Sequence, residues 1–83
     1  MKGEFHYVYM LQSLSQPHRF YVGQAQDLAA RLAEHNAGRV DYTARFAPWQ
    51  IETAVAFRNK DKALAFERYL KSHSGRAFAS RRF

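Results

Sequence analysis

The feature that most constrains the fold is the segment 4–12, which is rich in aromatic and β-favouring residues and is apolar on both of its alternating faces. One face carries Phe5, Tyr7, Tyr9 and Leu11, and the other carries His6, Val8 and Met10. A strand with a single buried face shows polar residues at every second position, whereas a strand buried on both faces does not. The segment therefore predicts a central strand in a sheet that is covered on both sides.

A second strand is predicted at residues 19–23, after a loop at 13–18 that contains Ser, Gln and Pro. The short connection favours an antiparallel hairpin. In such a hairpin Tyr9 and Tyr21 lie near each other across the two strands.

A third strand is predicted at residues 51–57, where large apolar side chains alternate with Glu and Ala. Residues 39–49, which precede it, are expected to form a loop or irregular segment that ends in Pro48 and Trp49. We expect Trp49 to anchor the core or the loop rather than to serve as a platform for a nucleobase.

Two helices complete the predicted elements. The first begins at Asp27, a good N-cap, and ends near Asn36, and Gly38 suits the left-handed position that follows a helix. Its apolar and polar stripes each repeat at four-residue spacing: Leu28 with Leu32, and Arg31 with His35. The second helix covers about residues 62–73, with Asp61 as its N-cap.

Length and composition exclude several classes of protein. Eighty-three residues suffice for one small domain, residues 1–83, and leave no room for a second. Area scaling buries about 64% of the unfolded surface, which supports a modest core but excludes a TIM barrel or a full Rossmann fold. The absence of cysteine excludes disulfides and a thiol nucleophile. No apolar run reaches the ~20 residues of a membrane span, and a cytoplasmic location is expected.

The charge distribution indicates a polyanionic partner. Thirteen Lys and Arg residues against seven Asp and Glu residues give a net charge of +6. Residues 1–44 hold four of each sign, whereas residues 45–83 hold nine basic and three acidic residues, so the excess lies wholly in the second half. Nine of the thirteen cations are arginines, which suit bidentate contacts with phosphate. Nucleic acid is the natural partner of such a chain.

One residue of the second predicted helix is out of place. The apolar face of this helix is formed by Ala63, Phe66 and Leu70, and Glu67 falls within the same arc. A carboxylate on a buried stripe is costly unless a cation or a metal ion meets it. The residues leave three interpretations open: an ion pair with an arginine such as Arg31, a side chain that turns toward solvent, or a metal ligand.

Two tyrosine-containing triplets supply a sharper hypothesis. The first is Tyr7-Val8-Tyr9, and after eleven intervening residues the second is Tyr21-Val22-Gly23. The first helix then carries Arg31 and His35, and the second carries Glu67. In this order and spacing the chain resembles the GIY-YIG nuclease family over nearly its whole length. A further set of residues is similar to the small, stand-alone bacterial branch of that family: His35-Asn36, Gly38, Tyr42-Thr43 and Pro48.

The resemblance implies an α+β fold in which a small three-stranded antiparallel sheet is flanked by helices. It implies a metal-dependent endonuclease that hydrolyses phosphodiester bonds, usually of DNA, with Mg²⁺ or Mn²⁺, and a place in DNA repair or recombination. The residues implied at the site are Tyr9, Tyr21, Arg31 and His35 as catalytic residues, Gly23 as the motif glycine and Glu67 as the metal ligand. A guanidinium and a divalent cation suit this reaction because negative charge builds up on the non-bridging phosphate oxygens.

The resemblance also implies that Tyr21 is the general base, assisted by His35. The sequence departs from the family at three places. Tyr7 stands where the family often has Gly, and Gln24 stands where some members have Lys. No Asn follows Asn59, although many members carry one beyond the metal-binding Glu.

Five cations of the second half are predicted to contact phosphates: Lys60, Lys62, Arg76, Arg81 and Arg82. Two alternatives to a nuclease remain, a non-catalytic DNA- or RNA-binding module and an accessory domain that docks on an acidic protein. Metal-dependent cleavage distinguishes the nuclease from both, and binding that weakens steeply with salt distinguishes the two alternatives from each other. The other three histidines are expected to be surface or packing residues: His6, His18 and His73.

Overall fold

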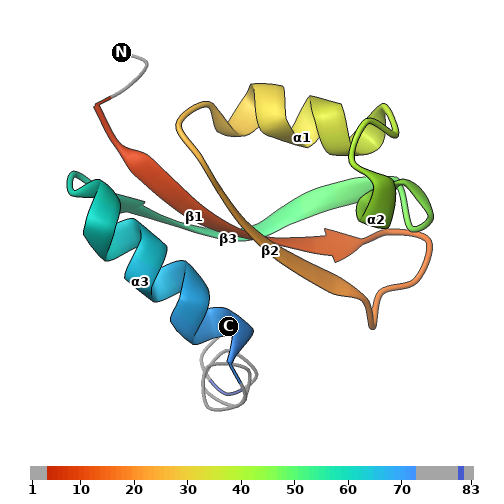
Figure 1. Cartoon of the computed structure of the whole chain (residues 1–83). Helices are drawn as coiled ribbons and strands as arrows, with labels where there is room; N and C mark the ends of the chain where they lie inside the picture. The colour runs from red at the N-terminus through yellow and green to blue at the C-terminus, as the bar shows by residue number, and fades with distance from the viewer. Residues whose placement is uncertain (1–3, 73–80, 82–83) are drawn as a thin grey trace.

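The structure is a computed structural model that describes residues 4–72 and residue 81, and it contains the predicted three-stranded sheet (Figure 1). The strands are β1 (His6–Ser13), β2 (Phe20–Ala25) and β3 (Trp49–Phe57), all antiparallel, in the order β2-β1-β3. β1 pairs with both neighbours, so the prediction that segment 4–12 forms the central strand is confirmed. The architecture is the α+β fold expected from the sequence.

The alternation along β1 sends its side chains into two separate cores on opposite faces of the sheet. On one face, Tyr9, Leu11 and Trp49 form a buried cluster with Leu28 and Leu32 of α1 (Leu28–Asn36). On the other face, Val8 packs with Ala63 and Leu70 of α3 (Lys60–Lys71). Figure 1 shows the two helices on opposite sides of the sheet. This burial of both faces explains why the first strand lacks polar alternation.

The pairing of β1 with β2 fixes the relation between the two tyrosine motifs. Tyr9 lies opposite Gly23, and Leu11 lies opposite Tyr21. The two motif tyrosines are therefore diagonal neighbours on the face that α1 covers. The expectation that they lie near each other across the hairpin is confirmed.

The ends of the helices follow local hydrogen-bonding chemistry. Asp27 is the N-cap of α1, as predicted, and its carboxylate accepts the backbone N–H of Ala30 at 3.0 Å. Gly38 has a φ of 76°, the left-handed conformation expected after the helix. The prediction that Asp61 caps α3 is wrong. Asn59 is the N-cap, because its side-chain oxygen accepts the backbone N–H of Lys62 at 3.0 Å, which places Asp61 inside the first turn.

The segment 39–49 is more regular than the sequence suggested. It contains a four-residue helix, α2 (Asp41–Ala44), and its last residue begins β3. The side-chain amide of Asn36 holds the start of β3: it donates to the carbonyl of Trp49 at 3.1 Å and accepts the backbone N–H of Trp49 at 2.6 Å. Trp49 is 2% exposed, and its indole N–H donates to the carbonyl of Thr43 at 2.8 Å. The expectation that Trp49 is an anchor is therefore confirmed.

Candidate active site

Tyr9 and Gly23 form the closest pairing of the two motifs. They are cross-strand partners, and a Cβ atom at position 23 would overlap the ring and the hydroxyl of Tyr9. The glycine is therefore needed to let the Tyr9 ring lie flat across β2. This close approach gives the motif glycine a steric reason.

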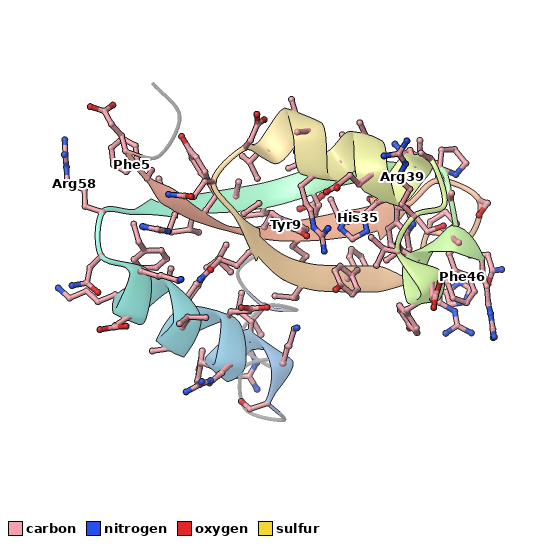
Figure 2. The ribbon with its side chains drawn as sticks, turned by 45° about the horizontal axis from the view of Figure 1, so that its top comes forward. Phe5, Tyr9, His35, Arg39, Phe46 and Arg58 are labelled. Atoms are coloured by element: carbon pink, nitrogen blue, oxygen red, sulfur yellow. The ribbon has the colours of Figure 1, made fainter. Side chains whose placement is uncertain are left out.

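His35 occupies the last turn of α1 and is completely buried. Its Nε2 atom lies 2.9 Å from the hydroxyl of Tyr9, and its Nδ1 atom lies 2.8 Å from the hydroxyl of Thr43 on α2. The His35 ring also meets the Tyr21 ring edge-on, with centroids 5.1 Å apart. Figure 2 shows Tyr9 and His35 side by side between the sheet and α1. The polar stripe expected on α1 thus has a buried end at His35.

The buried position of this cluster sets its protonation. Burial raises the pKa of Tyr9 above 10.0, although a hydrogen bond from Arg31 opposes that shift. Burial, reinforced by the positive charge of Arg31, lowers the pKa of His35 below 6.5. Near neutral pH both side chains are therefore uncharged, so that one can give a proton and the other can accept one.

Arg31 supplies the positive charge of the site. It lies one turn before His35 on α1, and its guanidinium Nη1 is 3.1 Å from the carboxylate of Glu34. Its side chain is 36% exposed, so it can reach an incoming anion as well as the Tyr9 hydroxyl. The hydrogen bond between Arg31 and Tyr9 raises the pKa of the guanidinium, which stays charged throughout the accessible pH range.

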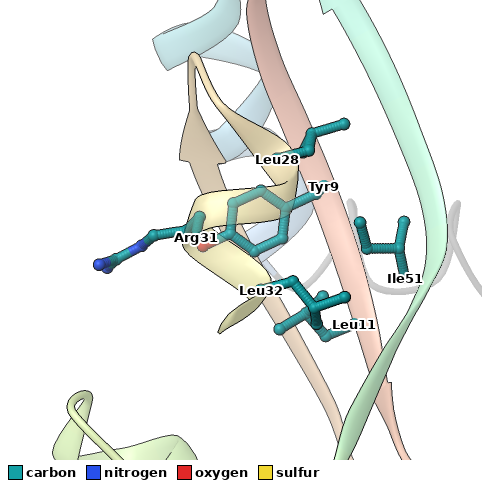
Figure 3. A pocket seen from close by; sticks show the side chains of 6 residues that line it. All are labelled: Tyr9, Leu11, Leu28, Arg31, Leu32 and Ile51. Carbon is teal, nitrogen blue, oxygen red and sulfur yellow. The ribbon is translucent and has the colours of Figure 1, made fainter. Parts of the chain in front are cut away.

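A small hollow beside Tyr9 is closed mainly by apolar side chains (Figure 3). Its six lining residues are Tyr9, Leu11, Leu28, Arg31, Leu32 and Ile51. A charged phosphodiester would lose its hydration against leucine and isoleucine without compensation. The hollow therefore belongs to the packing of α1 on the sheet, and the polar face of the site lies where Figure 3 shows Arg31 extending away from it.

Glu67 lies at the edge of the other core, on α3. Its side chain is 18% exposed, and its Oε2 atom is 3.1 Å from the ammonium of Lys71, one turn further along the helix. Glu67 does form an ion pair, but its partner is Lys71 and not an arginine; Arg31, the partner suggested from the sequence, pairs with Glu34. The role of Glu67 as a metal ligand stays a prediction. The Lys71 ammonium also lies 5.7 Å from the centroid of the Tyr21 ring. Lys71 therefore links the carboxylate on one face to the motif tyrosine on the other.

Whether the site can hold a metal ion depends on which side chains are available as ligands. Among the described residues, no group of three or more His, Cys, Asp or Glu side chains is arranged to hold one. This pattern does not fit zinc or a protein-enclosed calcium ion. It does fit Mg²⁺, which keeps several waters and is often bound by one carboxylate together with substrate phosphate. Glu67, whose carboxylate pairs with the lysine that lies over the Tyr21 ring, is the residue that could hold such an ion.

Gln24, the residue that follows the second motif, has an unused donor. Its side-chain nitrogen is buried and has no hydrogen-bond partner among the described residues. Gln24 lies opposite Val8, on the side of the sheet that α3 covers. Where some family members have Lys, this chain therefore presents a neutral N–H group.

Of the five cations predicted to contact phosphate, the structure describes three: Lys60, Lys62 and Arg81. Lys60 and Lys62 are exposed in the first turns of α3, seven and five residues before Glu67, which is about 10 Å and 8 Å along the helix. Arg81 is exposed. Arg76 and Arg82 lie outside the described residues, and the role of all five stays a prediction.

Sequence reasoning gave no role to Thr43, which the structure places in the centre of the site. Thr43 is fully buried, and its hydroxyl contacts His35. Its neighbour Tyr42 is 53% exposed and stacks on Tyr21, with ring centroids 6.1 Å apart. The available signal was the pair Tyr42-Thr43 in a segment rich in branch-specific residues, but only the short helix α2 turns these side chains toward His35.

Two tyrosine motifs on adjacent strands, with an arginine, a buried histidine and a lone carboxylate around them, define a small α+β domain of the nuclease type. The family model described as the GIY-YIG catalytic domain matches residues 5–81, and the chain belongs to the GIY-YIG family. No helix in the part of the chain that the structure describes is long and apolar enough to cross a membrane.

Relatives confirm the resemblance to the small branch of the family. The chain is 37% identical over 67 residues to a UPF0213 protein of Lactococcus lactis subsp. cremoris, covering 80% of this chain and 66% of the relative. It is 32% identical to a UPF0213 protein of Haloquadratum walsbyi, covering 87% of this chain and 80% of the relative. It is also 41% identical over 70 residues to the structure-specific endonuclease subunit SLX1 of Scheffersomyces stipitis. That match covers 76% of this chain but only 21% of the SLX1 protein.

Proposed function

We propose that this protein is a metal-dependent endonuclease that hydrolyses phosphodiester bonds of nucleic acid, with DNA as the principal substrate and Mg²⁺ or Mn²⁺ as the cofactor. The observation that carries the proposal is the cluster of Tyr9, His35 and Arg31. A neutral base and a hydroxyl lie 2.9 Å apart there, beside a cation whose charge acts on both. The name of the SLX1 relative, a structure-specific endonuclease subunit, supports the same class of reaction.

The residues divide the chemistry between them. The Arg31 guanidinium stabilises the charge that develops on the non-bridging oxygens, and Tyr9, fixed by Arg31 and His35, orients a phosphate oxygen or the attacking water. Tyr21 serves as the base toward that water in its deprotonated form, and takes the proton that the water loses on attack. His35, a neutral imidazole whose ring lies against that of Tyr21, assists by taking up the proton that Tyr21 gives up beforehand. Glu67 would hold the divalent cation, which when bound supplies further stabilisation of the phosphate charge.

The decisive experiment is plasmid nicking with and without Mg²⁺ or Mn²⁺, using Glu67→Gln. This variant removes the ligand charge at nearly constant volume, so cleavage should fall by orders of magnitude because metal stabilisation is worth several kcal/mol. Binding of DNA in the absence of metal should persist. Glu52→Gln is the matched control, because Glu52 is an exposed carboxylate on β3, and it should nick at the wild-type rate.

The assignment of the base is tested separately. The pH–rate profiles of Tyr21→Phe and His35→Ala should both show large losses if Tyr21 is the base and His35 its assistant. Near-native cleavage by Tyr21→Phe together with an inactive His35→Ala variant would instead identify His35 as the base.

One observation favours a second function, a DNA- or RNA-binding module. The carboxylate of Glu67 is already neutralised by Lys71 on its own helix. If the wild type cleaves no nucleic acid with either metal, and Glu67→Gln only melts at a different temperature, the binding module replaces the nuclease. Its binding constant should then fall steeply with salt concentration.

A further inference from the structure

The hydrogen bonds around His35 can be assigned one donor at a time. Arg31, whose guanidinium acts on the pKa of the Tyr9 hydroxyl, is a donor only and offers no acceptor. The Nε2 atom of His35, which lies 2.9 Å from that hydroxyl, is therefore the group that can accept the Tyr9 proton. Nε2 of the neutral ring must then carry a lone pair, which places the ring proton on Nδ1.

The hydrogen bonds on the Thr43 side of His35 lead to the same assignment. The Thr43 hydroxyl donates its single hydrogen to the carbonyl of Val40 at 3.2 Å. Its oxygen is left to accept from Nδ1 of His35 at 2.8 Å. Two independent hydrogen counts, from Tyr9 and from Thr43, thus agree on one tautomer of His35.

Thr43 is itself held in place from two directions. Its carbonyl accepts the indole N–H of Trp49 at 2.8 Å and the backbone N–H of Phe46 at 3.1 Å. Trp49 is in turn held by both groups of the Asn36 amide. The short helix α2 is therefore tied to the start of β3 and the end of α1. This fixes the position of the Thr43 hydroxyl.

We infer that Thr43 is a positioning residue of the site: it holds His35 in the Nδ1–H tautomer, with the basic Nε2 atom turned toward the tyrosine hydroxyl. The inference rests on the proposed nuclease function and deepens it. A histidine ring is directed in this way when its second nitrogen has one fixed partner. A buried ring that lost this partner would leave Nδ1–H without an acceptor, and the proton would redistribute between the two nitrogens.

The charged and titratable groups that face His35 come from three elements. Arg31 and Glu34 lie on its own helix and act in opposite directions on its charge. Tyr9 on β1 and Tyr21 on β2 contact its ring. Tyr9 is engaged at Nε2 and Arg31 has no acceptor to offer, so neither can replace the Thr43 hydroxyl at Nδ1.

The test compares Thr43→Val, which removes the hydroxyl at similar volume, with Thr43→Ser, which keeps it. Thr53→Val is the matched control, because Thr53 is the other threonine of the chain and lies on β3, where its hydroxyl donates to the carboxylate of its neighbour Glu52. Nitrogen-15 NMR of the histidine rings reports the tautomer directly, and plasmid nicking across pH reports the reaction.

The wild type, Thr43→Ser and Thr53→Val should show the Nδ1–H signature at His35. Thr43→Val should lose it, alter the pH–rate profile and cleave about 10-fold to 100-fold more slowly, the usual loss when a partner that orients a functional histidine is removed. An Nε2–H signature in the wild type overturns the inference, even if Thr43→Val does not fold. So does a Thr43→Val protein with the wild-type tautomer and pH–rate profile.

The two proposals fail in different ways. A wild type with the Nδ1–H signature that nicks no nucleic acid would remove the nuclease function and, with it, the catalytic value of the arrangement. A wild type that nicks normally but is insensitive to Thr43→Val would leave the nuclease in place and remove only the role of Thr43.

Discussion

The two faces of the sheet solve the problem of burial in opposite ways. Under α1, His35 and Thr43 are completely buried; they hydrogen-bond to each other, and His35 also bonds to the Tyr9 hydroxyl. Under α3, the buried cluster is wholly apolar, and Glu67 stays at its margin with 18% of its side chain exposed. A buried network of polar side chains holds one geometry only if each member has its hydrogen-bond partners. The packing of an apolar cluster depends instead on how well its side chains fill the available volume. The first face therefore fixes the geometry of the tyrosine–histidine cluster, and the second supplies stability and carries Glu67 at its margin.

The largest expected effect tests the apolar face. Leu70→Ala should lower the free energy of unfolding by about 2–5 kcal/mol, because it opens a cavity in the cluster under α3. Urea denaturation measures this loss. Leu14→Ala is the control, since Leu14 is 52% exposed and the same substitution there should cost less than about 0.5 kcal/mol. The folded Leu70→Ala protein should keep the wild-type pH–rate profile; an altered profile would show that the two faces are not separate in function.

The polar face is tested by Tyr9→Phe. Loss of the hydroxyl leaves Nε2 of His35 buried without its donor, which should cost about 1–3 kcal/mol of stability and also reduce cleavage. Thermal unfolding and nicking measure the two losses. Tyr7→Phe, two residues earlier on the same face of β1, should change stability by less than about 0.5 kcal/mol. Equal effects of the two variants would contradict the special place given to Tyr9.

A smaller effect concerns the pH dependence of stability. The pKa of His35 is lowered in the folded state, so below about pH 6.5 the unfolded chain binds more protons and stability falls as the pH decreases. The loss ends once the pH is below the folded pKa, and its slope is at most about 1.4 kcal/mol per pH unit for one group. Urea titrations between pH 7 and pH 5 should show it. His35→Gln should flatten this slope, while His18→Gln, at an exposed loop position, should leave it unchanged.

The smallest expected effect lies where the two faces meet. Lys71→Met removes the ammonium that neutralises Glu67, and divalent metal should then bind up to about fivefold more tightly, since exposed ion pairs are worth 0–1 kcal/mol. Calorimetry with Mn²⁺ measures this change. Lys62→Met, on the same helix but away from Glu67, should leave the affinity unchanged. A weaker affinity in Lys71→Met would mean that Lys71 helps to organise the metal site instead of competing for it.

The parts of the fold that follow local rules could be predicted from the sequence. The central strand, the Asp27 cap and the left-handed Gly38 all depend on side chains within a few residues of each other. The cap of α3 was assigned to Asp61, but Asn59 lies two residues earlier and is an equally good cap, and only the backbone shows that the helix begins after Asn59.

The candidate site was harder to predict because its contacts are long-range. His35 and Tyr9 are 26 residues apart, and no periodicity indicates that a polar helix position is buried at a tyrosine hydroxyl. The role of Thr43 depends on α2, whose four residues give too short a pattern to identify. The partner of Glu67 was misjudged for the opposite reason: a long-range arginine was suggested, whereas the actual partner is the lysine four residues later on the same helix.

The fit of Gly23 against Tyr9 has a consequence for how the two motifs can vary. Gly38 is the one described glycine with a positive φ, so Gly23 is required for space rather than for backbone freedom. Positions 9 and 23 therefore carry one joint constraint. In a library that randomises both, selection for folding alone should recover larger residues at 23 together with smaller ones at 9. Selection for cleavage should recover only the tyrosine–glycine pair, so the epistasis between the two strands measures how much of the motif serves the reaction.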